Sequence, residues 1–123
     1  MPQRILVVED SRTQAMRLKL ELQRCGVEVE IAITGTAGMT AARTHTPDAI
    51  VLDVDLPEID GYSLCRKLKS DALTAHIPVV MLTHRDEARD TMHGLEAGAE
   101  DYIPKDSFAE QNLMEALRLL GVL

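Results

Sequence analysis

The sequence predicts an α/β fold, in which a doubly wound, five-stranded parallel sheet carries helices on both faces. Two observations support this prediction. Short apolar runs rich in β-branched residues alternate along the chain with segments whose apolar residues recur at helical spacing. Three of these runs, at residues 5–8, 49–52 and 77–82, contain almost no polar residue, which is typical of strands buried on both faces. Strands that alternate with helices form parallel sheets covered on both sides.

Length and charge limit what the chain can be. Its 123 residues make one domain, 1–123, which we expect to be part of a longer protein because the chain stops directly after its last helix. A net charge of −7 argues against direct binding to nucleic acid or an anionic membrane. No apolar run could span a bilayer and no signal peptide is evident, so we expect a cytoplasmic location. Cys25 and Cys65 fit no metal-ligand spacing and are expected to be reduced core residues.

The first expected strand, residues 4–8, is followed by a helix. Ser11 and Gln14 stand at the spacing of a capping box, in which each side chain bonds to the other's backbone N–H. Gly26 ends the helix. Its buried stripe, at helical spacing, consists of Ala15, Leu18, Leu22 and Cys25.

The next elements lead to the centre of the sheet. Residues 27–33 alternate between apolar and polar, as expected of an edge strand with one buried face. A second helix covers about residues 35–43, and a proline separates it from the third strand, residues 49–53. The Asp60–Gly61 turn then starts a third helix. Its inward residues are Leu64, Cys65 and Leu68.

The C-terminal part repeats the pattern. Residues 77–83 form a buried strand, and Asp86 can cap a fourth helix. Residues 100–104 form a short strand whose proline suits a sheet edge. Ser107 and Glu110 make a second capping box. The expected inward residues are Met92 and Leu95 in the fourth helix, and Leu113, Leu117 and Leu120 in the last.

The alternating second strand and the proline-bearing fifth strand are expected at the edges. This fits the order 2-1-3-4-5 of a flavodoxin-like, (βα)5 sheet. Ligands bind such sheets at the carboxyl ends of the strands, which share one edge. Five chemically distinctive side chains follow or end strands and therefore fall on that edge: Glu9, Asp10, Asp53, Thr83 and Lys105.

These side chains point to phosphoryl transfer. Three acids gathered together are unfavourable unless a proton or a cation joins them. Mg²⁺ suits carboxylate oxygens, and usually takes one or two of them while keeping water. Lys105 and Thr83 can bind anionic oxygens. We therefore interpret Asp53 as a phosphoryl acceptor, with Mg²⁺ and Lys105 neutralising the charge that develops.

The chain resembles the receiver domain of response regulators in two-component signalling. The resemblance runs from Ile5 to Leu120, and its motifs are Glu9-Asp10, Asp53 to Pro57 with Gly61, Leu82-Thr83, and the run Gly98 to Tyr102 leading to Lys105. It implies that Asp53 receives a phosphoryl group from a histidine kinase or a histidine phosphotransfer protein. It also implies a Mg²⁺ site made by Asp10 and Asp53, with Glu9 assisting through water and the backbone carbonyl of Asp55 completing it.

The resemblance further implies a switch that acts on a downstream protein or output domain. In the family a hydroxyl, here Thr83, moves to the phosphoryl group, and an aromatic three residues before the lysine, here Tyr102, turns inward. The sequence departs from the family in three places, one of which is Asp55, an extra acid beside the acceptor. Pro104 precedes Lys105 instead of following it, and His84 stands where a small residue is usual, so we expect His84 to narrow access to Asp53.

Two other functions fit parts of the sequence. A docking module that is never phosphorylated is favoured by His84 and the displaced proline, but the five retained edge groups argue against it. Asp53-Val54-Asp55 also resembles the Asp-x-Asp motif of haloacid-dehalogenase-type phosphatases, yet that family has a small or hydroxyl residue where Leu56 stands. We expect a protein-interaction switch that catalyses only its own phosphorylation and dephosphorylation, and no enzyme acting on a separate substrate.

Overall fold

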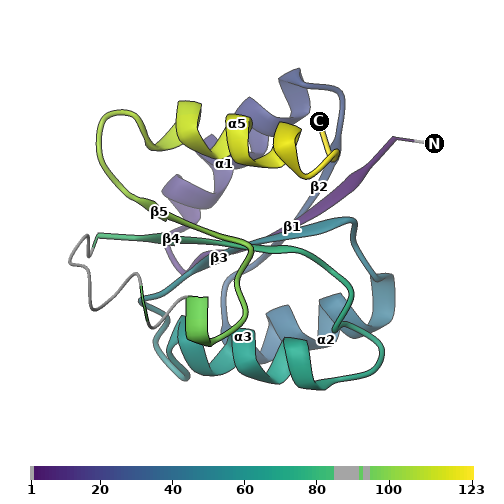
Figure 1. Ribbon diagram of the computed structural model, residues 1–123. Helices are drawn as coiled ribbons and strands as arrows, with labels where there is room; N and C mark the ends of the chain where they lie inside the picture. The colour runs from purple at the N-terminus through teal and green to yellow at the C-terminus, as the bar shows by residue number, and fades with distance from the viewer. Residues whose placement is uncertain (1, 85–91, 93–94) are drawn as a thin grey trace.

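The computed structural model describes residues 2–84, 92 and 95–123, and its strands form one parallel sheet in the order β2-β1-β3-β4-β5 (Figure 1). The strands are β1 Arg4–Val8, β2 Glu28–Ala32, β3 Ala49–Asp53, β4 Val79–Thr83 and β5 Asp101–Pro104. Each neighbouring pair is parallel. The predicted doubly wound order is therefore confirmed, with β2 and β5 at the edges.

Helices cover both faces of the sheet. Within the described residues they are α1 Arg12–Arg24, α2 Gly35–His45, α3 Gly61–Ser70 and α5 Ala109–Leu119. Figure 1 shows α1 and α5 on one face, and α2 and α3 on the other. None of the helices described is long and apolar enough to cross a membrane.

The expected fourth helix lies largely outside the described residues, and so does its expected cap, Asp86. Met92 and Leu95 are described, and the prediction that they face inward is wrong, because 54% and 52% of their surface is exposed. The smaller Ala97 and Ala99 are buried instead, in the core between the sheet and α3. The helical spacing of the larger apolar residues therefore predicted the wrong residues to be buried in this segment.

Two apolar layers hold the helices to the sheet. Strand residues alternate between the layers because successive side chains point to opposite faces. Leu6, Val8, Ile50 and Leu52 pack with Leu64, Cys65 and Leu68 of α3 on one face. Ile5, Val7 and Val51 pack with Leu18 and Leu22 of α1 and with Leu113 and Leu117 of α5 on the other. The sheet edge that carries the polar side chains is therefore built on strands fixed from both sides.

The helix starts were predicted only in part. Only half of the first capping box forms: Ser11 accepts a hydrogen bond from the backbone N–H of Gln14 at 3.3 Å, but the N–H of Ser11 donates to Glu9 instead of Gln14. The second capping box is wrong, because α5 begins after Phe108 and makes no side-chain cap bond. Asp106 instead accepts from the backbone N–H of Phe108 at 2.8 Å and shapes the turn before the helix.

Cys25 also differs from its prediction. It is exposed at the C-terminal end of α1, where the helix has already ended, so it lies outside the buried stripe. Cys65 is buried in α3, and its thiol donates to the carbonyl of Ala97 at 3.4 Å. Both cysteines are free thiols.

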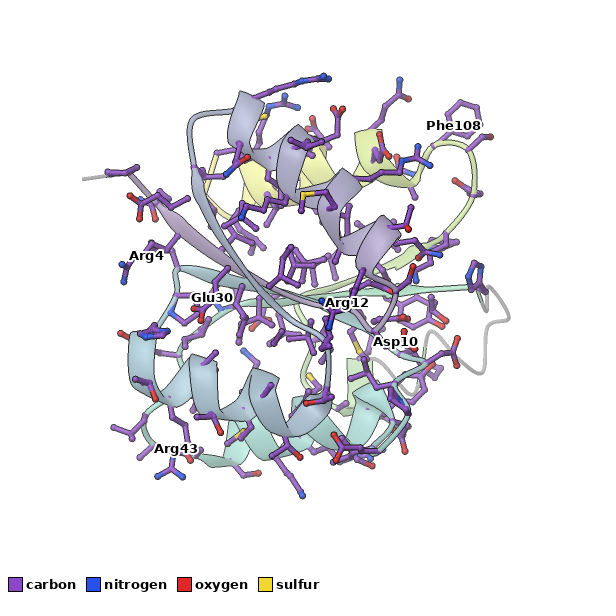
Figure 2. The ribbon with its side chains drawn as sticks, turned by 180° about the vertical axis from the view of Figure 1, so that it is seen from behind. Arg4, Asp10, Arg12, Glu30, Arg43 and Phe108 are labelled. Atoms are coloured by element: carbon purple, nitrogen blue, oxygen red, sulfur yellow. The ribbon has the colours of Figure 1, made fainter. Side chains whose placement is uncertain are left out.

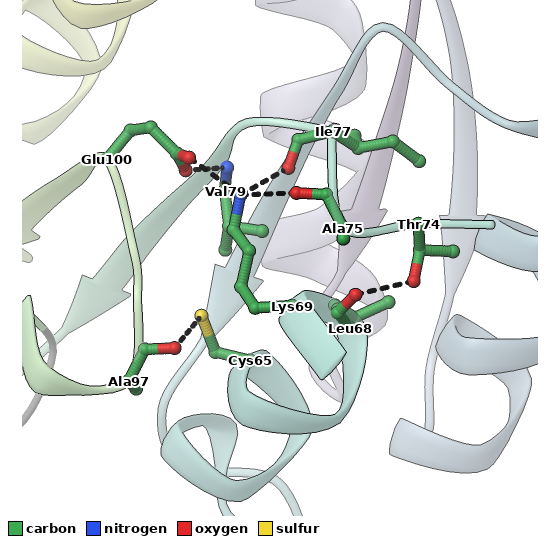
Figure 3. A network of polar contacts seen from close by, with 9 residues as sticks. All are labelled: Cys65, Leu68, Lys69, Thr74, Ala75, Ile77, Val79, Ala97 and Glu100. Carbon is green, nitrogen blue, oxygen red and sulfur yellow. Dashed lines mark hydrogen bonds and ion pairs between the residues drawn. The ribbon is translucent and has the colours of Figure 1, made fainter. Parts of the chain in front are cut away.

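A polar network ties the start of β4 to α3 (Figure 3). The ammonium of Lys69 donates to the carbonyl of Ile77 at 2.7 Å and to Oε1 of Glu100 at 2.6 Å. The other oxygen of Glu100 accepts from the backbone N–H of Val79 at 2.5 Å. Lys69 and Glu100 thus neutralise each other's charge, and they also bond to two backbone groups, the carbonyl of Ile77 and the N–H of Val79.

Candidate functional site

The expected site residues lie together at one edge of the sheet. Glu9 and Asp10 follow β1, Asp53 is the last residue of β3, Thr83 is the last residue of β4, and Lys105 follows β5. Figure 2 shows Asp10 at this edge and Arg4 at the opposite end of the sheet. Because the strands are parallel, residues that are distant in sequence become neighbours here.

Lys105 joins the buried acids of the site. Its ammonium nitrogen lies 3.0 Å from Oε2 of Glu9 and 3.3 Å from Oδ2 of Asp53. Only 13% of the Lys105 side chain is exposed, and only 3% and 4% of the two acids, so water screens these ion pairs weakly. Burial alone would lower the pKa of Lys105, but the hydrogen bond to Glu9 and the charge of Asp53 outweigh it and raise that pKa. The lysine is therefore a fixed cation directly beside the Asp53 carboxylate.

The acids of the site could hold a hard divalent cation. Glu9, Asp10 and Asp53 each offer a carboxylate oxygen, and these oxygens lie within 4.8 Å of one another. Burial and the neighbouring charge of Asp53 raise the pKa of Glu9 from 4.5 to about 7. Three carboxylates against one ammonium leave an excess of negative charge, which Mg²⁺ would offset. The donor set therefore fits Mg²⁺, with oxygen ligands only and with one acid, Asp10, open to solvent.

The loop after β3 is organised around the Asp53 carboxylate. The backbone N–H of Asp55 donates to Oδ1 of Asp53 at 3.1 Å, so both oxygens of that carboxylate have partners. The N–H of Gly61, the first residue of α3, donates to the carbonyl of Val54 at 2.8 Å. The side chain of Asp55 is exposed and stands outside the group of three acids found among the described residues.

Thr83 and Tyr102 lie on neighbouring strands and on the same face of the sheet. Tyr102 of β5 pairs with Met81 of β4, two residues before Thr83. Thr83 is fully buried, and its carbonyl accepts from the backbone N–H of Lys105 at 2.6 Å. The ring of Tyr102 is half-buried against the α3 side of the core, and its hydroxyl lies 3.2 Å from that of Tyr62. The two expected switch residues therefore lie on the same face of adjacent strands, offset by two residues along the sheet.

One residue at the site was missed from the sequence. Gln14 was assigned only to a helix cap, yet its side-chain carbonyl accepts from the ammonium of Lys105 at 3.1 Å. Its place in the first turn of α1, which starts at the edge that carries the acids, was the available signal. Gln14 also lines an open depression of about 420 Å³ between α1 and α5, together with Arg17, His84, Lys105 and Glu110. This depression gives access to Lys105 from solvent.

Fold and site together define the class of protein: a doubly wound domain with a buried Asp–Lys pair and an acidic cluster where its parallel strands end. The chain belongs to the response regulator receiver domain family, whose model matches residues 5–118. The resemblance inferred from the motifs is thereby confirmed, and so is a phosphoacceptor role in two-component signalling.

Curated relatives match nearly the whole chain but not their own whole length. The chain is 41% identical over 120 residues to the response regulator MprA of Mycobacterium sp. (strain KMS), a match that covers 98% of this chain and 51% of MprA. It is 43% identical over 105 residues to the response regulator PleD of Caulobacter vibrioides (strain NA1000 / CB15N), covering 85% of this chain and 23% of PleD. The chain therefore spans about half, or less, of these relatives.

Solved structures share the fold over almost the full chain. A putative response regulator from Chloroflexus aurantiacus J-10-fl superposes with a TM-score of 0.91 at 37% identity, covering 98% of both chains. The signal receiver domain of a signal transduction histidine kinase from Syntrophus aciditrophicus gives a TM-score of 0.86 at 39% identity, covering 97% of this chain and 90% of that one.

Proposed function

We propose that Asp53 is the phosphoryl acceptor of this receiver domain and that Lys105 and Thr83 assist the transfer. The observation that supports the proposal most directly is the buried contact of 3.3 Å between the Lys105 ammonium and the Asp53 carboxylate, beside two further acids. A buried cation lowers the cost of adding a doubly charged phosphoryl group to an acidic site.

The transfer requires one bond to form and one to break. An Asp53 carboxylate oxygen attacks the phosphorus of the donor, and the bond between phosphorus and the donor atom breaks, with its electron pair staying on the donor. With a phosphohistidine donor, the imidazole nitrogen leaves and takes up a proton. Lys105 stabilises the oxygens that gain charge, and the Thr83 hydroxyl donates to one of them.

Glu9, Asp10 and Asp53 would hold Mg²⁺, and the backbone carbonyl of Asp55 is proposed as a further ligand. When bound, Mg²⁺ supplies positive charge that offsets the acids and the incoming phosphoryl oxygens. The arrangement of the three carboxylates, two buried and one solvent-exposed, supports this proposal because it leaves one side for water and substrate oxygens.

The proposed donors are a histidine kinase or a histidine phosphotransfer protein, and the proposed readout is a change of surface. Movement of the Thr83 hydroxyl would vacate space for the Tyr102 ring, changing the surface around β5 and α5 that a downstream protein or output domain contacts. We place the domain in the cytoplasm and infer that it acts on no substrate beyond its own phosphoryl group. Its acidic surface argues against direct contact with nucleic acid or membrane.

The experiment that tests the proposal is intact-mass measurement after incubation with acetyl phosphate and Mg²⁺. The parent protein should gain one phosphoryl group, and Asp53→Asn should gain none. Asp48→Asn is the matched control, because Asp48 precedes the same strand at its other end and bonds to the backbone of Arg4. No gain in a parent protein that still binds Mg²⁺ would favour a docking module that does not use phosphate.

A further inference from the structure

The ammonium of Lys105 has three N–H donors, and three acceptors from three different residues surround it. Oε2 of Glu9 lies at 3.0 Å, Oε1 of Gln14 at 3.1 Å and Oδ2 of Asp53 at 3.3 Å. Two of the acceptors are carboxylates, whereas Gln14 is a neutral amide. Gln14 thus completes the hydrogen bonding of a largely buried ammonium without adding charge to an already acidic site.

The structure also shows why the Gln14 side chain is available. In a complete capping box it would reach back to the backbone N–H of Ser11. That N–H instead donates to Oε1 of Glu9 at 3.2 Å, while Ser11 still caps the N–H of Gln14. Glu9 therefore takes over one half of the cap and leaves the Gln14 amide free to turn toward Lys105.

We propose that Gln14 is a positioning residue for phosphoryl transfer, which holds the Lys105 ammonium between Glu9 and Asp53 before the donor arrives. This inference rests on the proposed function of Asp53 and Lys105. A neutral acceptor suits the role, because it orients the ammonium but binds it more weakly than a third carboxylate would. Lys105 can then exchange Gln14 for a phosphoryl oxygen when the reaction adds negative charge beside Asp53.

The test uses Gln14→Met, which keeps the length, the flexibility and the helix propensity of the side chain but removes the acceptor. Gln23→Met is the matched control, because Gln23 is an exposed residue at the other end of the same helix. With acetyl phosphate and Mg²⁺, we expect the maximal phosphorylation rate of Gln14→Met to fall about threefold to tenfold, the effect of losing one ordinary intramolecular hydrogen bond. The donor concentration at half-maximal rate should change little, because Gln14 acts through Lys105.

A second readout separates positioning from a general structural effect. A hydrogen-bonded, buried lysine ammonium exchanges its protons slowly enough to give a ¹H–¹⁵N signal, which Lys105→Arg assigns by its loss. We expect this signal in the parent protein and in Gln23→Met, a weakened signal in Gln14→Met, and recovery in Gln14→Glu, which restores an acceptor. Gln14→Glu should nevertheless transfer phosphate slowly, because its carboxylate competes with the phosphoryl oxygens for Lys105.

Each failure has its own meaning. If Gln14→Met matches Gln23→Met in both rate and ammonium signal, the positioning role is wrong while the function of Asp53 stands. If the parent protein takes up no phosphate at all, the proposed function fails, and the role of Gln14 fails with it.

Discussion

Gly61 lies so close to Asp53 that no side chain fits between them. A Cβ atom built on Gly61 would stand 2.5 Å from the carbonyl oxygen of Asp53 and 2.7 Å from Cα of Val54. The first residue of α3 therefore packs directly against the backbone of the proposed acceptor. The contact fixes where β3 ends and where the Asp53 carboxylate stands relative to Lys105.

Gly61→Ala should therefore disturb both stability and phosphorylation. The added methyl group meets backbone, which cannot rotate away, so we expect a loss of about 1–3 kcal/mol in the free energy of unfolding. Urea denaturation followed by circular dichroism measures it. The contrast is Gly26→Ala, where the Cβ would touch nothing within 4 Å but the backbone has a φ of +86°. That variant should lose about 1–2 kcal/mol, because a residue with a Cβ is strained in the left-handed region, and keep the parent phosphorylation rate. Equal rates in all three proteins would contradict the role of Gly61.

The sheet and the placement of its polar edge could be predicted because they follow from patterns along the strands. Continuous apolar runs identified β1, β3 and β4 as central, and the alternation of β2 identified an edge. Once the order was set, the position of Asp53 and Lys105 on one edge followed from parallel geometry alone. No knowledge of side-chain packing was needed at that level.

The errors came where tertiary contacts override local spacing. Ser107 and Glu110 have the spacing of a capping box, but the turn made by Asp106 starts α5 later than that spacing implies. Cys25 continues the apolar spacing of α1 but stands beyond the helix end. The bond between Gln14 and Lys105 joins residues 91 positions apart, so only the folded structure reveals it.

Lys69→Met should destabilise the domain more than the loss of an ordinary surface ion pair. Lys69 is 18% exposed and bonds to two carbonyls as well as to Glu100, so its removal leaves a partly buried carboxylate and two backbone acceptors without their cation. We expect a loss of about 1–3 kcal/mol in the free energy of unfolding. Arg24→Met, which breaks the exposed pair of Arg24 with Glu21, should cost less than about 1 kcal/mol. Similar losses in the two variants, measured by urea denaturation, would show that the network in Figure 3 adds no particular stability.

The two cysteines should differ sharply in reactivity. Burial raises the pKa of the Cys65 thiol from 9.0 to about 11, and the side chain is inaccessible, whereas Cys25 is exposed. Since only thiolate reacts, we expect one fast thiol and one at least ~100-fold slower when the folded protein meets an aromatic disulfide reagent at pH 8. Cys25→Ser should remove the fast phase. In urea, Cys65 should react quickly as well. A fast phase that survives in folded Cys25→Ser would mean that Cys65 opens to solvent far more often than its packing implies.

The stability of the metal-free domain should depend on pH through Glu9. Burial and the charge of Asp53 raise its pKa to about 7, against 4.5 ordinarily. Below about pH 4.5 Glu9 is protonated in both the folded and the unfolded chain, so its burial carries no charge penalty. As the pH rises toward and through 7, Glu9 ionises in the unfolded chain at lower pH than it does in the folded protein. The free energy of unfolding therefore falls by about 1.4 kcal/mol per unit of pKa shift.

Glu9→Gln should remove this dependence, because glutamine does not titrate. Urea denaturation in EDTA at several pH values measures the difference in unfolding free energy between variant and parent. Glu9→Gln also loses the ion pair with Lys105, which changes the unfolding free energy by a further amount. The informative quantity is therefore how the difference between variant and parent changes with pH. That difference should shift in favour of the variant between pH 4.5 and 8. If the difference in unfolding free energy between Glu9→Gln and the parent did not change with pH, Lys105 would fully compensate the buried charge of Glu9. The acidic cluster would then need no cation to offset Glu9.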